Sequence, residues 1–311
     1  MSARHTSPLQ ALLIDPAFDG EVYDREPMKR HTTYRIGGPA RYYVRANSLG
    51  ALTSLIDRCN EANVAWVVIG GGSNLLVSDK GFDGVVISLG RDFRTLKRDD
   101  EQARFFAGAG VKLATVVTEA FTHNYEGLEF AVGTPGTVGG ALRMNAGTRD
   151  RWIGELVESV TYLEEGKRLT HKSAPELFWE YRRGPFSRDD VILECSLKVT
   201  PADPFYIRGK MEANLARRKR NQPLQVASCG SVFKNPPGES AAALIEACNL
   251  KGTRVGGACI SELHANFIIN DQGASAQDVC DLMVLAQTKV REVYGIELQP
   301  EVRFLGFDEA H

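Results

Sequence analysis

The sequence predicts an α+β protein of two domains, and three observations support this. Segments of strand composition alternate with amphipathic helical segments up to about residue 200. The run TPADP at 200–204 then marks a boundary, because proline and a capping aspartate end one element and begin another. A third block with its own helices and strands follows. In this chain of 311 residues we predict one domain over 1–202, with lobes at about 1–90 and 91–202, and a smaller domain over 203–311.

Composition and charge exclude several classes of function. The formal net charge of −2 leaves no basic surface for nucleic acid or an anionic membrane. No apolar run approaches the ~20 residues needed to span a bilayer, and the N-terminal apolar segment is too short for a signal peptide. The six cysteines form no CxxC pair, so neither a zinc site nor a redox dithiol is indicated. We therefore expect a cytoplasmic protein with reduced cysteines and no metal.

The first lobe is predicted from strand composition and one clear helix. A short helix around 9–14 precedes a strand at 40–46. Ser48 is an N-cap candidate for the helix that follows. The apolar face of that helix comprises Leu49, Leu52, Leu55, Ile56 and Cys59. Strands are predicted at 66–69 and 84–89, with no helix between them.

The remaining elements follow from the same patterns. A strand at 105–111 runs into a helix at 112–121, and strands follow at 156–163 and 191–199. After residue 202, Asp203 can cap a helix that begins at Pro204. The last block has a helix at 241–248, a strand at 266–270, a helix at 275–294 and a strand at 300–306. Ser275 and Asp278 form a capping pair, and Val279, Leu282, Met283, Ala286, Val290 and Val293 give the last helix one apolar face.

Two glycine-dense segments stand out: IGGGSNLLVSD at 69–79 and GTPGTVGGALRMNAG at 133–147. Glycine loses more backbone freedom on folding than other residues, so such runs persist where backbone must approach something closely. A phosphate or a flat cofactor is one such partner, and tight turns between packed elements are the alternative. The first segment does not fit the dinucleotide pattern GxGxxG opening a helix, and the candidate at 105–111 has Leu113 in place of its third glycine. A nicotinamide-type Rossmann domain is therefore not indicated.

Motifs along nearly the whole chain resemble those of a known family. From about residue 31 to 306 they read HTTYRIGG, VIGGGSNLLVSD, GTPGTVGGALRMNAG, the pair Tyr181-Arg182, CGSVFKNP, HANFIIN and PEVRF. In this order they resemble the UDP-N-acetylenolpyruvoylglucosamine reductases of bacterial cell-wall synthesis. The compact stretch at 150–190 matches the subgroup that lacks an extra tyrosine loop. The resemblance implies a two-lobed FAD-binding domain of the vanillyl-alcohol-oxidase type, followed by a smaller α+β substrate-binding domain.

The resemblance also implies an activity. It is the NADPH-dependent, FAD-mediated reduction of the enolpyruvyl ether of UDP-N-acetylglucosamine-enolpyruvate to UDP-N-acetylmuramate. This reaction belongs to peptidoglycan precursor synthesis, and through it to cell-wall biogenesis, cell shape and cell division. FAD would be bound non-covalently, NADPH would be the co-substrate, and the partners would be small molecules only.

Site residues are implied by their places in the matching motifs. The catalytic residues would be Arg182, Ser231 as general acid, and Glu301. The FAD-binding residues would be Arg35, Gly70, Gly71, Gly72, Ser73, Asn74, Gly133, Thr134, Pro135, Thr137, Gly139, Gly140 and Gly147, with backbone donors on the pyrophosphate. The substrate-binding residues would be Lys234, Asn235, His264 and Arg303. The fork of donors on Arg182 suits a planar carboxylate, and Glu301 can assist an enolate only when it is protonated or hydrogen-bonded.

Two departures from the family pattern and two other functions remain to be weighed. Gly184 stands near the arginine where serine is usual, and Cys229 stands where alanine is common. One alternative is another flavin enzyme, such as an alcohol or sugar oxidase; many of these tether FAD through His or Cys, and neither glycine segment contains one. The other alternative is a catalytically silent nucleotide-binding module, against which the intact catalytic set argues.

Overall fold

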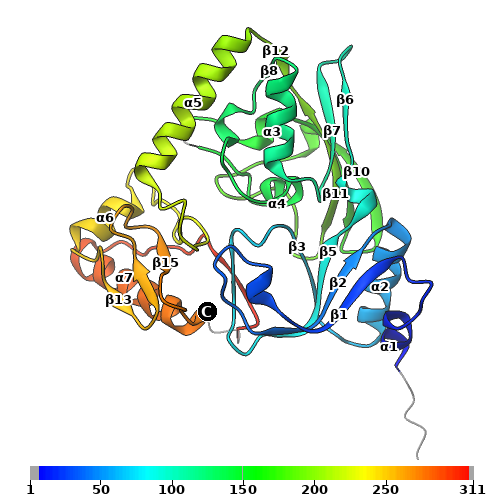
Figure 1. Cartoon of the computed structure of the whole chain (residues 1–311), viewed down its shortest axis with the longest axis horizontal. Helices are drawn as coiled ribbons and strands as arrows, with labels where there is room; N and C mark the ends of the chain where they lie inside the picture. Colours follow the sequence, from blue (N-terminus) through cyan, green and yellow to red (C-terminus); the bar gives the residue numbers. More distant parts are fainter. Residues whose placement is uncertain (1–6, 149, 308–311) are drawn as a thin grey trace, which may run out of the picture. The chain divides into compact units, whose positions relative to one another are not determined.

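The computed structural model describes residues 7–148 and 150–307, which divide into two compact units (Figure 1). Unit 1 comprises residues 1–25, 41–70 and 83–214, and unit 2 comprises 26–40, 71–82 and 215–311. Two early segments therefore belong with the C-terminal third of the chain. The boundary after residue 202 stays a prediction, because these units follow contacts and not a single cut in the chain.

A four-stranded sheet lies mainly in unit 1. Its order is β1 (Gly20–Pro27), β2 (Pro39–Ala46), β5 (Phe82–Leu89) and β3 (Trp66–Ile69). Strands β3 and β5 are parallel, with Trp66 opposite Val85. Helix α1 (Pro8–Leu13) contacts α2 (Leu49–Glu61), whose predicted Ser48 cap is confirmed. Leu49, expected on the apolar face, is 37% exposed, so the predicted face was too wide at that end.

A five-stranded antiparallel sheet forms the rest of the unit 1 framework (Figure 1). Its order is β10 (Arg168–Ser173), β9 (Val157–Glu164), β11 (Val191–Lys198), β7 (Arg104–Gly108) and β6 (Leu96–Asp99). The predicted strands at 156–163 and 191–199 are confirmed as β9 and β11. Helix α4 (Val138–Arg143) contacts β7 and β11; it lies inside the second glycine-dense segment, where no helix was predicted.

The smaller elements complete the chain. Helix α3 (Leu113–Thr122) leads to β8 (Tyr125–Glu126), which pairs with β12 (Thr200–Pro201). Helix α5 (Pro204–Asn221) begins where predicted, because Asp203 Oδ1 accepts hydrogen bonds from the N–H groups of Phe205 and Tyr206. Short 3-10 turns lie at Met28–Arg30, Arg91–Arg94, Glu129–Ala131, Ile153–Leu156 and Ala174–Glu176.

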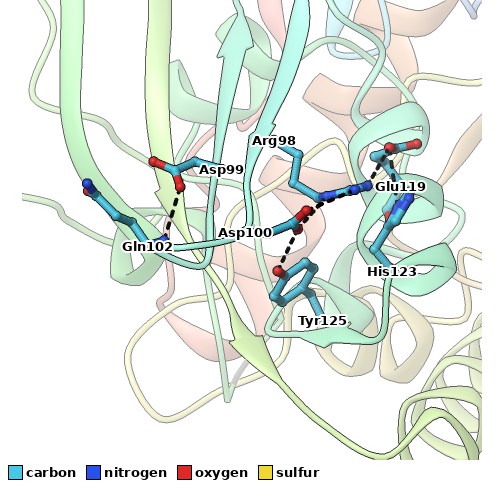
Figure 2. Close-up of polar contacts among 7 residues, drawn as sticks. All are labelled: Arg98, Asp99, Asp100, Gln102, Glu119, His123 and Tyr125. Carbon is cyan, nitrogen blue, oxygen red and sulfur yellow. Dashed lines mark hydrogen bonds and ion pairs between the residues drawn. The ribbon is translucent and has the colours of Figure 1, made fainter.

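A polar cluster fastens the β6–β7 hairpin to helix α3 (Figure 2). Arg98 lies 2.6 Å from Asp100 and 3.4 Å from Glu119 of α3. The Tyr125 hydroxyl donates to Asp100 over 2.8 Å. The Arg98 guanidinium, followed by the Tyr125 hydroxyl, holds the pKa of Asp100 below its ordinary value. The hairpin is thereby held beside the helix that follows it.

Unit 2 contains a three-stranded antiparallel sheet and two helices. The strands are β13 (Arg254–Val255), β14 (Ala258–Ile260) and β15 (Ile268–Asn270), and the helices are α6 (Ala241–Ala247) and α7 (Ala276–Tyr294). Strand β4 (Leu75–Val77) pairs in parallel with β16 (Arg303–Leu305). The early segments therefore join the C-terminal part through this strand pair and through a core that includes Tyr34 and Leu76.

Helix α7 confirms the predicted capping pair. The Ser275 hydroxyl accepts from the Asp278 N–H over 3.0 Å, and Asp278 accepts in return from the Ser275 N–H over 2.9 Å. Gly295, with φ of +68°, ends the helix in the left-handed region. Val293 was expected on the apolar face, but it is 61% exposed because the last turn extends past the core.

Within the part of the chain that the structure describes, no helix is both long and apolar enough to cross a membrane. The six cysteines are free thiols, five of them buried. Among the same residues, no group of three or more His, Cys, Asp or Glu side chains could hold a metal ion.

Replacing Ser275 with alanine should lower the free energy of unfolding by about 1 kcal/mol, because the Asp278 N–H loses its acceptor. Urea titration followed by circular dichroism measures this change. Ser275→Thr keeps a hydroxyl and serves as the control. Equal stability of the alanine and threonine variants would contradict the capping role.

Candidate active site

A cavity of about 600 Å³, open solvent included, lies in unit 1. It lies at the ends of β3 and β5 and at the start of α4. Its lining comprises Val68, Ile69, Gly70, Ser88, Leu89, Arg94, Ala109, Gly110, Thr137, Gly139, Gly140, Arg143, Asp190, Val191 and Ile192.

The glycines of this lining allow close packing of backbone. A Cβ on Gly70 would lie 2.4 Å from Thr137 Oγ1, and a Cβ on Gly139 would lie 2.9 Å from the Ala109 Cβ. Both distances are too short for a side chain to fit without a shift. The Gly139 N–H donates to the Ala109 carbonyl over 2.9 Å, which joins α4 to the segment after β7.

The first N–H groups of α4 are engaged within the protein. The Val138 N–H donates to Val111 O, the Gly139 N–H to Ala109 O, and the Gly140 N–H to Thr137 Oγ1. The start of this helix therefore does not present these three amides to a phosphate. Here the glycine run brings backbone segments into direct contact and shapes the cavity wall.

Only some of the predicted cofactor residues of unit 1 line this cavity. Gly70, Thr137, Gly139 and Gly140 line it, whereas Gly133, Thr134, Pro135 and Gly147 do not. Sequence reasoning missed the lining residues Ser88, Arg94, Gly110 and Arg143. Gly110 had a signal, because it is one of the two glycines in the segment FFAGAGV at 105–111. Arg143 lies inside the second glycine-dense segment but was given no role of its own, whereas Ser88 and Arg94 lie in ordinary strand and turn sequence and carried no signal.

Arg182 lies at the tip of a tight turn. Glu180 and Arg183 exchange backbone hydrogen bonds of 3.0 and 3.1 Å, which leaves Tyr181 and Arg182 at the tip. Arg182 has φ of +57°, a conformation that costs energy for a residue with a side chain. Its Nη1 donates to the Gly147 carbonyl over 2.9 Å, and its guanidinium lies 5.4 Å from the centre of the Tyr181 ring. The second glycine-dense segment thus fixes the arginine.

The Asn145 side chain is hydrogen-bonded to the same turn. Its Nδ2 donates to Glu180 O over 2.9 Å, and its Oδ1 accepts from the Gly154 N–H over 3.1 Å. The side chain is buried, so both bonds form away from water. Asn145 lies inside the second glycine-dense segment, yet no role was predicted for it. The structure identifies it as the residue that positions the Arg182 turn.

In unit 2, the segment that carries Ser231 is clamped by Asn266. The Val232 N–H donates to Asn266 O over 2.9 Å. Phe233 both donates to and accepts from the Asn266 side chain, over 2.9 and 2.8 Å. Gly230 has φ of +84°, which only glycine adopts at low cost, and it turns the chain into Ser231.

Glu301 lies on a segment bonded to the Ser231 segment. The Glu301 N–H donates to Val232 O over 2.8 Å. Asn74 joins them, because its Nδ2 donates to Glu301 O over 3.0 Å and its own carbonyl accepts from the Arg303 N–H over 3.0 Å. The first glycine-dense segment, the Ser231 segment and the Glu301 segment are therefore brought together within unit 2.

The motif around Arg35 packs on the same glycine segment. The Thr33 N–H donates to Gly72 O over 3.1 Å, and the Thr32 hydroxyl donates to Ile36 O over 2.9 Å. A Cβ on Gly72 would lie 1.9 Å from His31 O, and its φ is +62°, so this position requires glycine. Arg35 itself is exposed on this turn, with φ of +56°. Gly71 and Ser73, the other predicted FAD residues here, lie in the part of the first glycine-dense segment that belongs to unit 2.

The predicted substrate residues also lie in unit 2. Asn235 Oδ1 accepts from the Ala241 N–H at the start of α6, over 3.0 Å. His264 Nδ1 accepts from the Asn266 N–H over 3.2 Å, so the ring proton is assigned to Nε2. Burial lowers the pKa of His264, and the ring is neutral at pH 7. Lys234 is bonded through its backbone to Gln299, and Arg303 begins β16.

Comparison with known proteins identifies the family. Residues 222–305 match the family described as "UDP-N-acetylenolpyruvoylglucosamine reductase, C-terminal domain", and residues 40–165 match the family described as "FAD binding domain". The UDP-N-acetylenolpyruvoylglucosamine reductase of Heliobacterium modesticaldum is 41% identical over 93% of this chain and 92% of its own length. This chain belongs to the UDP-N-acetylenolpyruvoylglucosamine reductase family.

Further relatives agree with this placement. The reductase of Desulfosudis oleivorans is 40% identical over 94% of this chain and 97% of its own. The crystal structure of UDP-N-acetylenolpyruvylglucosamine reductase from Thermus caldophilus has a TM-score of 0.78, with 34% identity over 92% of this chain and 98% of that one. The predicted family and the α+β fold, an FAD-binding domain followed by the reductase C-terminal domain, are confirmed.

One departure from the family pattern has a physical reason. The Gly184 N–H donates to Arg143 O over 2.9 Å, at the end of α4. A Cβ at this position would lie 2.3 Å from Leu142 O, so serine would not fit in this packing. The glycine therefore allows the chain after the Arg182 turn to pack directly on α4.

The other departure, Cys229, lies in the core beside the Ser231 segment. Burial raises the pKa of Cys229 to about 12, and the negative charge of Glu301 acts in the same direction. The thiolate is the reactive form of cysteine, so at neutral pH this thiol is unreactive. Cys229 is a packing residue of the reductase and not a point of thiol sensitivity.

Asn145→Ala should retain FAD and lower kcat between about ten- and a hundredfold, because a small displacement of Arg182 costs that much in a positioned site. Arg182→Ala should also retain FAD, and its loss of kcat is the reference against which the loss in Asn145→Ala is compared. Asn124→Ala is the matched control. Asn124 is exposed, and its φ of +59° is similar to the +44° of Asn145. Steady-state assays measure kcat, and flavin absorbance measures the bound FAD. A kcat equal to that of Asn124→Ala would contradict the positioning role.

Cys229 should resist alkylation by iodoacetamide at pH 7.5 in the folded protein, because it is buried and protonated. Mass spectrometry of labelled peptides measures its rate against that of Cys248, which is only partly buried. Cys229 should become labelled after denaturation. Labelling in the folded state as fast as at Cys248 would show that the thiol is accessible.

Proposed function

We propose that this chain catalyses the NADPH-dependent, FAD-mediated reduction of UDP-N-acetylglucosamine-enolpyruvate to UDP-N-acetylmuramate. It would act in the cytoplasm, in peptidoglycan precursor synthesis and thereby in cell shape and division. The observation that carries the proposal is the identity of about 40% over more than nine-tenths of the chain with reductases of this name. The bonded segments that carry Ser231 and Glu301 support it further.

The residues of the unit 1 cavity suit FAD. Four glycines line it and bring backbone to the cavity wall, and Arg94 and Arg143 supply positive charge toward a diphosphate. The remaining predicted FAD residues, Arg35 and Gly71 to Asn74 among them, keep their proposed role. When bound, FAD would supply the hydride transfer between NADPH and the enolpyruvyl double bond.

Arg182 is proposed to bind the carboxylate of the enolpyruvyl group. Hydride addition to the terminal vinyl carbon builds negative charge on the adjacent carbon and its carboxylate. A guanidinium presents a planar fork of donors that matches a carboxylate. The bond from Nη1 to Gly147 O fixes the plane of this fork before substrate arrives, and preorganised charge of this kind is usually the largest contribution to catalysis.

Ser231 is proposed to deliver the proton that completes the reduction. A free hydroxyl is a weak acid, so it can protonate carbon only where the enolate is strongly basic. The clamp by Asn266 holds the segment of Ser231 in one position. Glu301, on the neighbouring segment, assists the enolate as a protonated or hydrogen-bonded carboxyl group, because a second bare anion would repel it.

The UDP-sugar is proposed to contact Lys234, Asn235, His264 and Arg303. Two of these are cations, which suit a diphosphate. His264 is neutral, so its Nε2–H can donate a hydrogen bond to an uncharged oxygen of the substrate. The four residues come from three different segments of unit 2.

An absorbance spectrum and an anaerobic titration test the proposed function. The purified protein should be yellow, and denaturation should release free FAD, which excludes a covalently tethered flavin. NADPH should bleach the flavin, and UDP-N-acetylglucosamine-enolpyruvate should restore its colour. Failure of the sugar nucleotide to reoxidise the reduced protein would reject the reductase assignment, and a colourless apoprotein that takes up no FAD would reject flavin chemistry.

Ser231→Ala should retain bound FAD and its reduction by NADPH, yet lose turnover by at least about a hundredfold, as general acids contribute about 10²–10⁴-fold. Stopped-flow absorbance separates the two half-reactions. Ser228→Ala is the control, because the Thr33 hydroxyl donates to the Ser228 backbone carbonyl, which this substitution retains. Loss of flavin reduction as severe as the loss of turnover would show that Ser231 is not the proton donor.

A further inference from the structure

Ser88 is a buried polar residue of the cavity without a partner. It lies near the end of β5, opposite Ile69 of β3, and both residues line the cavity. The side chain is 5% exposed, and its hydroxyl oxygen has no hydrogen-bond partner. Buried hydroxyl groups are almost always hydrogen-bonded, so an orphaned one at a ligand cavity points to a missing partner.

The other polar side chains of the lining are engaged. Thr137 Oγ1 accepts from the Gly140 N–H, and Arg94 Nε donates to Leu89 O. Arg143 donates to the carbonyls of Ser187 and Asp190. Of the lining residues that the structure describes, Ser88 alone has a buried side-chain N or O atom without a partner.

The cavity also differs from the proposed reaction site in its residues. Arg182, Ser231 and Glu301 are not among its lining, whereas two arginines and four glycines are. This composition suits the adenosine diphosphate part of FAD and not the reacting ring. The argument rests on the FAD-dependent function proposed above.

We propose that the Ser88 hydroxyl is a hydrogen-bond partner of the adenosine diphosphate part of FAD. Its role is binding and not catalysis. Because the hydroxyl has no partner in the protein, it contributes no hydrogen bond to the fold. Ser88 therefore gains its hydrogen bond only when the dinucleotide is present.

Ser88→Ala tests this assignment through binding alone. FAD is removed from the wild-type and variant proteins, and the apoproteins are titrated with FAD while flavin fluorescence is followed. The variant should bind FAD about three- to tenfold more weakly, as expected for one neutral hydrogen bond. Competition by ADP should weaken by the same factor, whereas competition by flavin mononucleotide should not change. The melting temperature of the apoprotein should not fall.

Ser196→Ala is the matched control. Ser196 is also a buried strand serine, at 3% exposure, but its hydroxyl donates to Glu158 over 3.0 Å and lies outside the cavity lining. This variant should lower the melting temperature of the apoprotein and leave FAD affinity unchanged. Ser88→Cys, which preserves volume with a weaker donor, should shift FAD affinity in the same direction as Ser88→Ala.

Three outcomes would overturn the assignment. FAD affinity of Ser88→Ala within twofold of wild type would show that the hydroxyl makes no contact. A weakened affinity that comes with a melting temperature lowered as in Ser196→Ala would show a structural role. Wild-type apoprotein that binds no FAD at all would instead overturn the proposed function on which the assignment rests, and the two failures are thereby distinguished.

Discussion

The close approach of backbone segments at the glycines is the constraint on which the rest of this structure depends. At Gly70, Gly139 and Gly72 an added Cβ would lie between 1.9 and 2.9 Å from its nearest neighbour. The first two contacts form the cavity wall in unit 1, and the third joins the Arg35 turn to the first glycine segment in unit 2. The glycines thus serve packing first, and the space left beside them becomes the site.

Three asparagines hold the segments of the proposed catalytic residues. Asn145 bonds the backbone of the Arg182 turn, Asn266 bonds that of the Ser231 segment, and Asn74 bonds Glu301 O. A carboxamide both donates and accepts, so one side chain can satisfy backbone groups of irregular segments that no strand or helix pairs. Each such bond fixes the backbone without adding a charge that would compete with the substrate.

Sequence patterns predicted several of the regular elements from local signals. The Ser48 and Ser275 caps and the Asp203-Pro204 start were readable because capping depends on neighbouring residues only. Helix α4 and strand β1 were missed, since glycines conceal helical periodicity and the N-terminal region has weak alternation. Ser88 carried no signal, because a strand serine becomes unusual only when its surroundings leave it without a partner.

The charges of the Ser231 region explain why a hydroxyl suits the proposed proton donor. Burial raises the pKa of Cys229 to about 12 and lowers that of His264, so both groups are neutral near pH 7. A thiolate there would oppose the build-up of negative charge on the enolate. With both neutral, Lys234 and Arg303 carry the positive charge of the residues proposed to bind the substrate in unit 2. Neither Cys229 nor His264 then adds a charge that would oppose proton transfer from Ser231 to carbon.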